Sequence, residues 1–86
     1  MNSELTAKMT ARLNKIEGQV RGVRGMVERG EYCDDILTQI ASVQASMGAV
    51  AKMLLDSHIK TCISPRLAKG DESAVGELVK TVGRLM

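Results

Sequence analysis

The segment from about residue 34 to residue 63 limits most strongly how this chain can fold. Its apolar residues follow one helical stripe at heptad-like spacing, and no proline interrupts it before Pro65. The stripe consists of Ile36, Ile40, Val43, Met47, Val50 and Leu54. A helix of about 30 residues is long by the standards of globular domains. Because no segment of equal length remains to cover its stripe, we expect a second copy of the chain to pack against it.

Two further helices are expected on either side of this segment. Apolar residues recur every three or four positions over residues 4–29, where Gly30 supplies the stop, and again over residues 72–85. The residue before a proline avoids the helical region, so the helix 34–63 should end near Ile63 or Ser64, followed by a loop. The sequence therefore predicts an all-α fold with three helices in a single domain, residues 1–86.

The composition favours oligomerisation. The chain has no Trp and no Phe, and Tyr32 is its one aromatic residue. A domain of this size buries only about 60% of its unfolded surface, so its core is thin without a partner. Gly18, Gly22 and Gly25 lie inside the first helix, and each costs roughly 1 kcal/mol of helix propensity against Ala. We expect close approach of another helix to offset that cost.

Several classes of protein are disfavoured. No apolar run approaches the length of a membrane span, and the N-terminal stretch MNSELTAKMT lacks a signal-peptide core. We therefore expect a cytoplasmic protein with no membrane partner, in which the two cysteines are thiols. The chain has no phosphate-binding loop, no acid/base pair and no nucleophile with a base and an orienting group, so we do not expect an enzyme.

The charge is unevenly distributed. Residues 1–30 carry six basic residues against three acidic ones, although the whole chain has a net charge of only +2. Lys8, Arg12 and Lys15 continue with Gln19 as a polar row at helical spacing. A basic first third favours an anionic partner, whereas the simpler interpretation is a solvated helix face.

Three residues with soft side chains form a candidate metal site. His58 and Cys62 are four residues apart and share a helix face, and Cys33 projects within about 40° of them around the helix axis. A continuous helix would nevertheless separate Cys33 from His58 by about 37 Å. Antiparallel pairing of two copies removes that separation, whereas a break in the helix near Gly48 would remove the need for a second copy.

The donor set of this candidate site limits the metal. Two thiolates and one imidazole suit Cu(I) or Zn(II), and three ligands without a fourth fit Cu(I) better, because zinc normally takes four. The alternative is two buried cysteines and a surface histidine with no shared role.

Two stretches of the chain carry a family signature. They are RLNKIEGQVRGVRGMVERGEYCDDILTQI and VAKMLLDSHIKTC, and they include Cys33, His58 and Cys62 at steps of 25 and 4 residues. With these features the chain resembles the CsoR/RcnR family of small all-helical bacterial repressors, most closely its copper-sensing branch. The resemblance covers nearly the whole chain.

The resemblance implies an antiparallel four-helix-bundle dimer, with dimers associating into a homotetramer. It implies that Cu(I) is held by Cys33 of one protomer and by His58 and Cys62 of another. It also implies a transcriptional repressor whose metal-free form binds operator DNA and whose copper-loaded form releases it, which derepresses copper-export genes.

The resemblance also assigns supporting residues. Tyr32 and Glu77 are implied to lie beside the metal ligands rather than on the metal. Arg12 falls where the family has a basic residue important for DNA binding. Further candidates for DNA contact are Lys15, Arg21 and Lys52.

Other branches of the family match less well. Its nickel and cobalt sensors use an N-terminal histidine, which this chain lacks, and its formaldehyde sensors carry a proline where this chain has Asn2. Its persulfide sensors keep both cysteines and lack the histidine. Copper sensing is therefore expected, and a persulfide- or thiol-sensing repressor acting through Cys33 and Cys62 is the alternative. A plain helical interaction module with no role at DNA is a further alternative.

Overall fold

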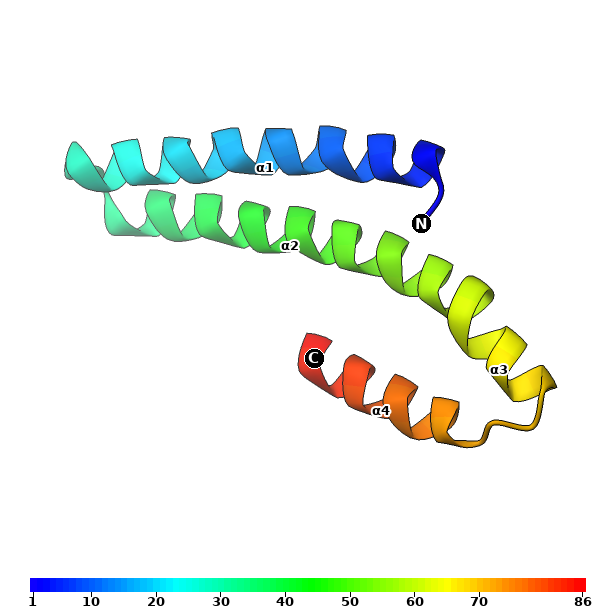
Figure 1. The fold of residues 1–86 in the computed structure, drawn as a ribbon. Coiled ribbons are helices and arrows are strands. Elements are labelled where there is room, and N and C mark those ends of the chain that lie inside the picture. Colours follow the sequence, from blue (N-terminus) through cyan, green and yellow to red (C-terminus); the bar gives the residue numbers. More distant parts are fainter. The chain divides into compact units, whose positions relative to one another are not determined.

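The computed structural model describes residues 1–86 and confirms the all-helical fold. The elements are α1 (Ser3–Glu28), α2 (Cys33–His58), a π-helical turn η1 (Ile59–Ile63), α3 (Ser64–Ala68) and α4 (Ser73–Leu85) (Figure 1). The bounds of α1 and α4 differ by at most one residue from the ranges expected from periodicity. The chain divides into two compact units, residues 1–50 and residues 51–86.

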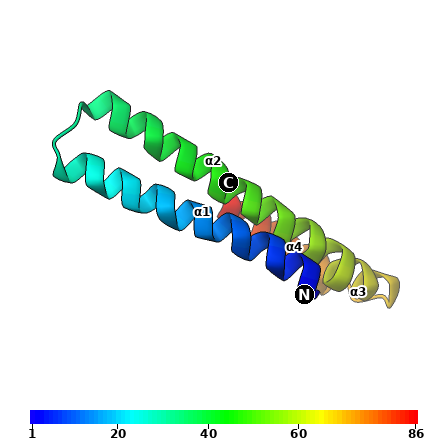
Figure 2. The ribbon, with the colours of Figure 1, turned by 90° about the horizontal axis from the view of Figure 1, so that it is seen from above.

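In the first unit, α1 and the beginning of α2 lie side by side and run in opposite directions, in both views (Figures 1 and 2). The reversal occurs at Gly30, whose φ of 66° is in the left-handed region that favours glycine. The Gly30 N–H bonds the Val27 carbonyl and the Glu31 N–H bonds the Met26 carbonyl, which together make a Schellman cap. Gly30 therefore ends α1, as expected.

Local side-chain chemistry stabilises the starts of the first two helices. At the start of α1, the Asn2 side chain accepts the Leu5 N–H at 2.7 Å. Asp34 and Asp35 lie in the first turn of α2, where the positive end of the helix dipole favours acids.

The helix α2 continues past Gly48 without interruption to His58. The break that would have removed the need for a second copy is therefore absent.

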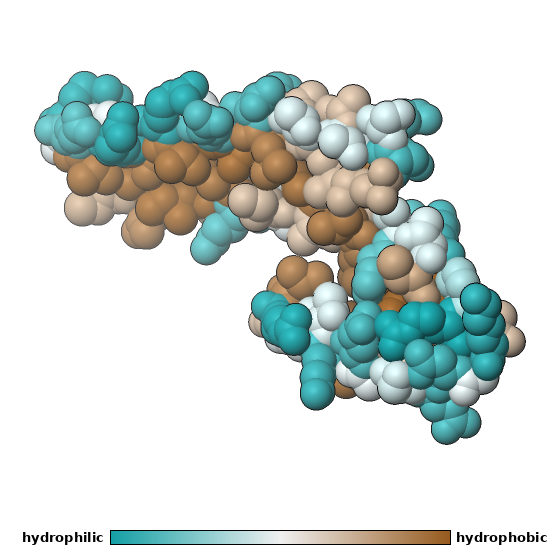
Figure 3. Space-filling model, viewed as in Figure 1, coloured by the Kyte–Doolittle hydropathy of each residue, from teal (hydrophilic) through white to brown (hydrophobic).

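The first unit leaves much of its apolar surface uncovered. Ile16 and Val50 are buried, but Val20, Leu37 and Met47 are each about half exposed. Figure 3 shows apolar residues gathered along one side of this hairpin and hydrophilic residues along the other. The expected close helix contact at the α1 glycines is not made within the chain, because a Cβ at Gly22 would meet no atom within 4 Å.

The second unit corrects one expectation. The helix does not end near Ser64: it widens into the π turn η1 and then continues as α3, with Pro65 in the first turn of α3. A proline lacks an N–H and clashes with the carbonyl four residues earlier in a regular α-helix. The π turn, where the Ser64 N–H bonds the Ile59 carbonyl, relieves this conflict directly before Pro65.

The core of the second unit is small and lies where η1, α3 and α4 contact one another. Ile63 and Ala74 are its fully buried residues. The chain reverses at Gly70, with φ of 85°, and the Asp71 N–H bonds the Arg66 carbonyl in a second Schellman cap. None of the helices combines the length and the apolar character that crossing a membrane would require.

Two glycine substitutions should have opposite effects on stability. Gly30→Ala places a Cβ on a left-handed residue and should lower the free energy of unfolding by about 1–2 kcal/mol. Gly22→Ala lies in open space in the middle of α1 and should raise the free energy of unfolding by about 0.5–1 kcal/mol. Denaturant unfolding followed by circular dichroism measures both. A destabilising Gly22→Ala would instead mean that another copy packs on this face of α1.

Candidate metal centre

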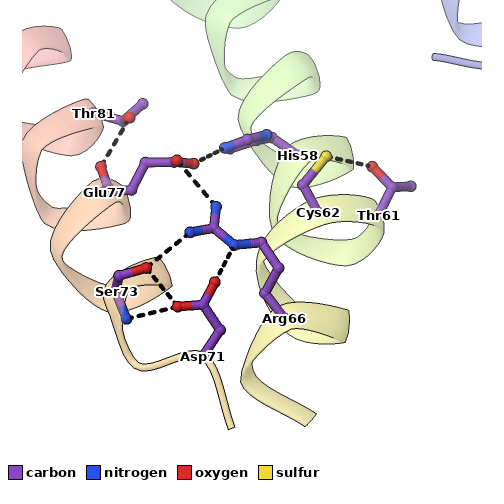
Figure 4. A network of polar contacts seen from close by, with 8 residues as sticks. All are labelled: His58, Thr61, Cys62, Arg66, Asp71, Ser73, Glu77 and Thr81. Carbon is purple, nitrogen blue, oxygen red and sulfur yellow. Dashed lines mark hydrogen bonds and ion pairs between the residues drawn. The ribbon is translucent and has the colours of Figure 1, made fainter. Parts of the chain in front are cut away.

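The three candidate ligands lie on one continuous helical segment. Cys33 is the first residue of α2, His58 is its last residue, and Cys62 lies in η1. His58 and Cys62 are on neighbouring turns (Figure 4). Both cysteines are free thiols and both are exposed in the single chain. No three His, Cys, Asp or Glu side chains of one chain gather closely enough to hold a metal ion.

Glu77 determines how the imidazole of His58 is presented. Oε2 of Glu77 lies 3.1 Å from Nε2 of His58. An ionised carboxylate only accepts hydrogen bonds, so Nε2 is the donor. In the neutral imidazole this leaves Nδ1 without a proton and able to bind a metal. Glu77, which the sequence resemblance implied to be near the ligands, therefore contacts His58 directly.

Arg66 occupies the other oxygen of Glu77. Its Nη1 donates to Oε1 of Glu77 at 3.0 Å and its Nε donates to Oδ2 of Asp71 at 2.9 Å. Its Nη2 lies 3.3 Å from Oγ of Ser73. The other carboxylate oxygen of Asp71 accepts the backbone N–H of Ser73 at 3.0 Å, where α4 begins. Figure 4 shows this chain of contacts running from α3 through α4 to His58.

The network shifts the ionisation of its acids. The hydrogen bond from Arg66 is the main reason that the pKa of Glu77 lies below its usual range, and His58 lowers it further. The pKa of Asp71 is lowered first by Ser73 and then by Arg66. Asp71 and Glu77 in turn raise the pKa of Arg66. Both acids are therefore charged at neutral pH, which keeps the network of hydrogen bonds intact.

The surroundings of the candidate ligands differ. An open apolar hollow of about 290 Å³ lies beside His58. It is lined by Ala51, Leu54, Leu55, Thr81 and Leu85 as well as His58.

Tyr32 is 73% exposed, and its carbonyl accepts the N–H groups of Asp35 and Ile36 at the start of α2. The structure thus gives Tyr32 a backbone role next to Cys33 and leaves its side chain free.

The candidate DNA-binding residues are exposed, but they differ in their partners. Arg21 pairs with Glu17 at 3.1 Å. Arg12, Lys15 and Lys52 make no ion pair within the chain. Arg12 and Lys15 are three residues apart on α1, so they share one face of that helix. Of the four candidates, Arg21 alone has an acid within reach to neutralise it.

Sequence reasoning missed Arg66, Asp71 and Ser73. The stretch SPRLAKGD was expected to be a loop, and a loop gives no basis for pairing Arg66 with residues further along the chain. The available signal was Gly70 followed by an acid and a serine. A glycine after one helix, followed by an Asp whose side chain accepts the N–H of the Ser that begins the next helix, is the pattern of a helix stop followed by a helix start.

Known proteins similar in sequence to this chain are metal-sensing transcriptional repressors. Residues 6–84 match the family model described as "Metal-sensitive transcriptional repressor". The copper-sensing transcriptional repressor CsoR of Bacillus subtilis is 49% identical over 73 residues, which cover 84% of this chain and 72% of that protein.

Solved structures share the fold. The copper-sensing repressor CsoR from Geobacillus thermodenitrificans, determined with Cu(I), superposes with a TM-score of 0.89 at 38% identity, covering 98% of this chain and 88% of that one. The nickel-responsive transcriptional regulator InrS superposes with a TM-score of 0.79 at 36% identity, covering 93% and 91%. Because relatives with different metals share this fold, the fold alone does not select the metal.

The hydrogen bonds that Asp71 accepts from Ser73 at the start of α4, together with its contact with Arg66, should make the second unit sensitive to acid. Because its pKa in the folded chain lies below the ordinary value of 3.8, the stabilisation is complete above that pH and is lost as the pH falls through the lowered pKa. Asp71→Asn should therefore lower the melting temperature at neutral pH. The melting temperature of this variant should also fall less between neutral pH and acid than that of the unmodified protein. Thermal unfolding between about pH 7 and pH 2 measures this. Asp56→Asn, which removes an acid from an exposed pair with Lys60, is the matched control.

Proposed function

This chain belongs to the family of metal-sensitive transcriptional repressors, and we propose that it is a copper(I)-sensing repressor. In this proposal the metal-free protein binds operator DNA, and binding of copper(I) releases it. The relatives named as copper sensors support the choice of metal. The observation in this chain that carries the proposal is that Glu77 engages Nε2 of His58 and leaves Nδ1 free on the turn next to Cys62.

The donor set fits copper(I). Cys33, His58 and Cys62 provide two thiolates and one imidazole, which are soft to borderline ligands. Both thiols are free and exposed, so no disulfide competes for them, and Cys62 makes only a long contact of 3.7 Å with the Thr61 hydroxyl. The carboxylate of Glu77 is held by Arg66 and His58, and it is therefore not available as a fourth ligand of the kind that favours zinc. Copper(I) bound there would supply a link between the three side chains in place of the two thiol protons.

A second copy of the chain completes the site in this proposal. Cys33 begins α2 and His58 ends it, and a helix of this length separates its ends by about 37 Å. Antiparallel pairing of two α2 helices would bring Cys33 of one copy beside His58 and Cys62 of the other, as a two-fold axis requires. The half-exposed apolar residues Leu37, Met47 and Leu54 support such pairing, since an isolated chain leaves them in water. Pairs of dimers then form the homotetramer.

The basic residues of α1 supply the contact with DNA. Arg12 and Lys15 lie on one face and make no ion pair within the chain, so their charges are available to phosphates. Phosphate contacts repeated over several copies release counterions, and binding then weakens steeply as salt increases. The effector acts only if it binds the low-affinity state more tightly, and the coupling is reciprocal. Lys52 is a further candidate of the same kind.

A thiol-sensing repressor of the same family is the second candidate. The exposure of both thiols favours it as well, because persulfide or disulfide chemistry needs accessible sulfur. Mass spectrometry after polysulfide treatment distinguishes the two functions. A copper sensor responds to copper without any covalent change at Cys33 or Cys62.

Substitution of the ligands should separate DNA binding from its control. Cys33→Ala, His58→Ala and Cys62→Ala should each bind the promoter as tightly as the unmodified protein and lose or weaken release by copper(I). His58→Ala is the most informative, because two thiolates remain to bind metal without the imidazole. Anaerobic copper(I) titration of the protein on its own upstream promoter DNA measures stoichiometry and release together. Normal release from His58→Ala would exclude His58 from the response.

Two arginines of α1 should differ in their effect on DNA binding. Arg12→Ala should bind the operator more weakly, and the slope of log affinity against log salt should fall by about one for each phosphate that Arg12 neutralises. Arg21→Ala, whose charge is paired with Glu17, should weaken binding less. Gel-shift titrations at several salt concentrations measure both, with helicity by circular dichroism as the control. Equal affinity of Arg12→Ala and the unmodified protein would contradict a role for Arg12 at DNA.

A further inference from the structure

Arg66 is the residue of the polar network that joins its two carboxylates, Glu77 and Asp71. Its guanidinium donates to Glu77 and to Asp71 through different nitrogens, at 3.0 and 2.9 Å. A guanidinium is planar and its donors are fixed relative to one another, so holding one carboxylate orients the donors that hold the other. Asp71 is itself anchored by the backbone N–H of Ser73 and by the Schellman turn at Gly70. Arg66 is therefore held in one orientation by the turn between α3 and α4.

Glu77 needs such a support. Its side chain is 46% exposed, and a glutamate loses considerable rotamer freedom when it is fixed. A single hydrogen bond to His58 leaves the rest of that carboxylate free to rotate away. The bond from Nη1 of Arg66 to Oε1 removes this freedom and directs Oε2 at Nε2 of His58. Each oxygen of the Glu77 carboxylate then has its own partner, Arg66 for Oε1 and His58 for Oε2.

We propose that Arg66 is a positioning residue of the metal site, which acts through Glu77 to hold His58 with Nε2 protonated and Nδ1 free. The inference rests on the proposed function for the identity of the ligand and on the geometry alone for the orientation of His58. The ion pairs of Arg66 are partly exposed, at 34% for its side chain, and exposed pairs add little to stability. The effect of Arg66 is therefore on the orientation of His58 rather than on folding.

The placement of Arg66 depends on the π turn. An α-helix advances about 100° per residue, and a π turn contains an extra residue, so every position after η1 is rotated relative to an uninterrupted α-helix. Arg66 follows this turn by three residues and faces Glu77 on α4. The irregularity that accommodates Pro65 thus also directs Arg66 towards the residue that orients His58.

The metal-free protein offers a direct test, because His58 is the only histidine in the chain. Long-range proton–nitrogen spectra of protein labelled with ¹⁵N-histidine, at about pH 8 where an ordinary imidazole is neutral, report its tautomer. The unmodified protein should show the form protonated at Nε2. Arg66→Met, which keeps an unbranched side chain, should show a mixture of both tautomers. Its affinity for copper(I), measured anaerobically by competition with a chromophoric chelator, should fall about tenfold.

Three further variants make the test specific. Lys69→Met removes one positive charge at the end of the same helix, where Lys69 makes no ion pair, and should leave tautomer and affinity unchanged. Arg66→Lys keeps the positive charge but lacks the planar guanidinium. Its tautomer ratio and its copper(I) affinity should lie between those of the unmodified protein and those of Arg66→Met. In a Glu77→Gln background, Arg66→Met should cause no further loss, because Arg66 acts through Glu77. Circular dichroism checks that each variant is folded.

The outcomes separate this inference from the proposed function. If Arg66→Met keeps the tautomer and the affinity of the unmodified protein while Glu77→Gln loses both, Arg66 has no positioning role and copper sensing stands. The same holds if Arg66→Met and Glu77→Gln lower the affinity additively. If the unmodified protein does not bind copper(I), the proposed function fails, and the metal-free tautomer comparison still decides whether Arg66 orients His58.

Discussion

The rest of the molecule depends on the continuity of α2, which runs without a break from Cys33 to His58. An α-helix rises about 1.5 Å per residue and does not fold back on itself, so side chains at its two ends cannot share an ion. A site made of Cys33, His58 and Cys62 therefore needs more than one chain. In the function we propose, the metal links side chains of two copies, so its binding acts on the contact between them and can change how the assembly holds DNA.

The amount of uncovered apolar surface supports the same conclusion. The buried apolar side chains are only Ile16, Val50, Ile63 and Ala74, whereas many other apolar side chains remain in contact with water. Burying one such side chain contributes about 1.5–3 kcal/mol, so a partner that covers several of them supplies much of the stability of a chain this short. The contacts that would stabilise the assembly and those that would complete the metal site then lie along the same helix.

The chemistry of the site depends on a smaller feature, the contact between Glu77 and His58. A nickel-responsive regulator has the same fold, so the helical scaffold is compatible with more than one metal. In the function we propose, the choice between metals lies instead with the donors and with the nitrogen that His58 presents. Glu77 selects that nitrogen, and Arg66 and Asp71 hold Glu77 in place. Since exposed ion pairs add little stability, the main consequence of this network is geometric.

The sequence by itself determined the helical fold and the end of α1 at Gly30. These features depend on residues within about one helical turn of each other, where periodicity and backbone preferences act. Only the tertiary structure decided that the helix passes Pro65 through a π turn and that Arg66 meets Glu77. Those two residues lie 11 positions apart, and Glu77 lies 19 from His58. Their contact depends on the reversal of the chain at Gly70, because no local preference determines how two separate helices are brought together.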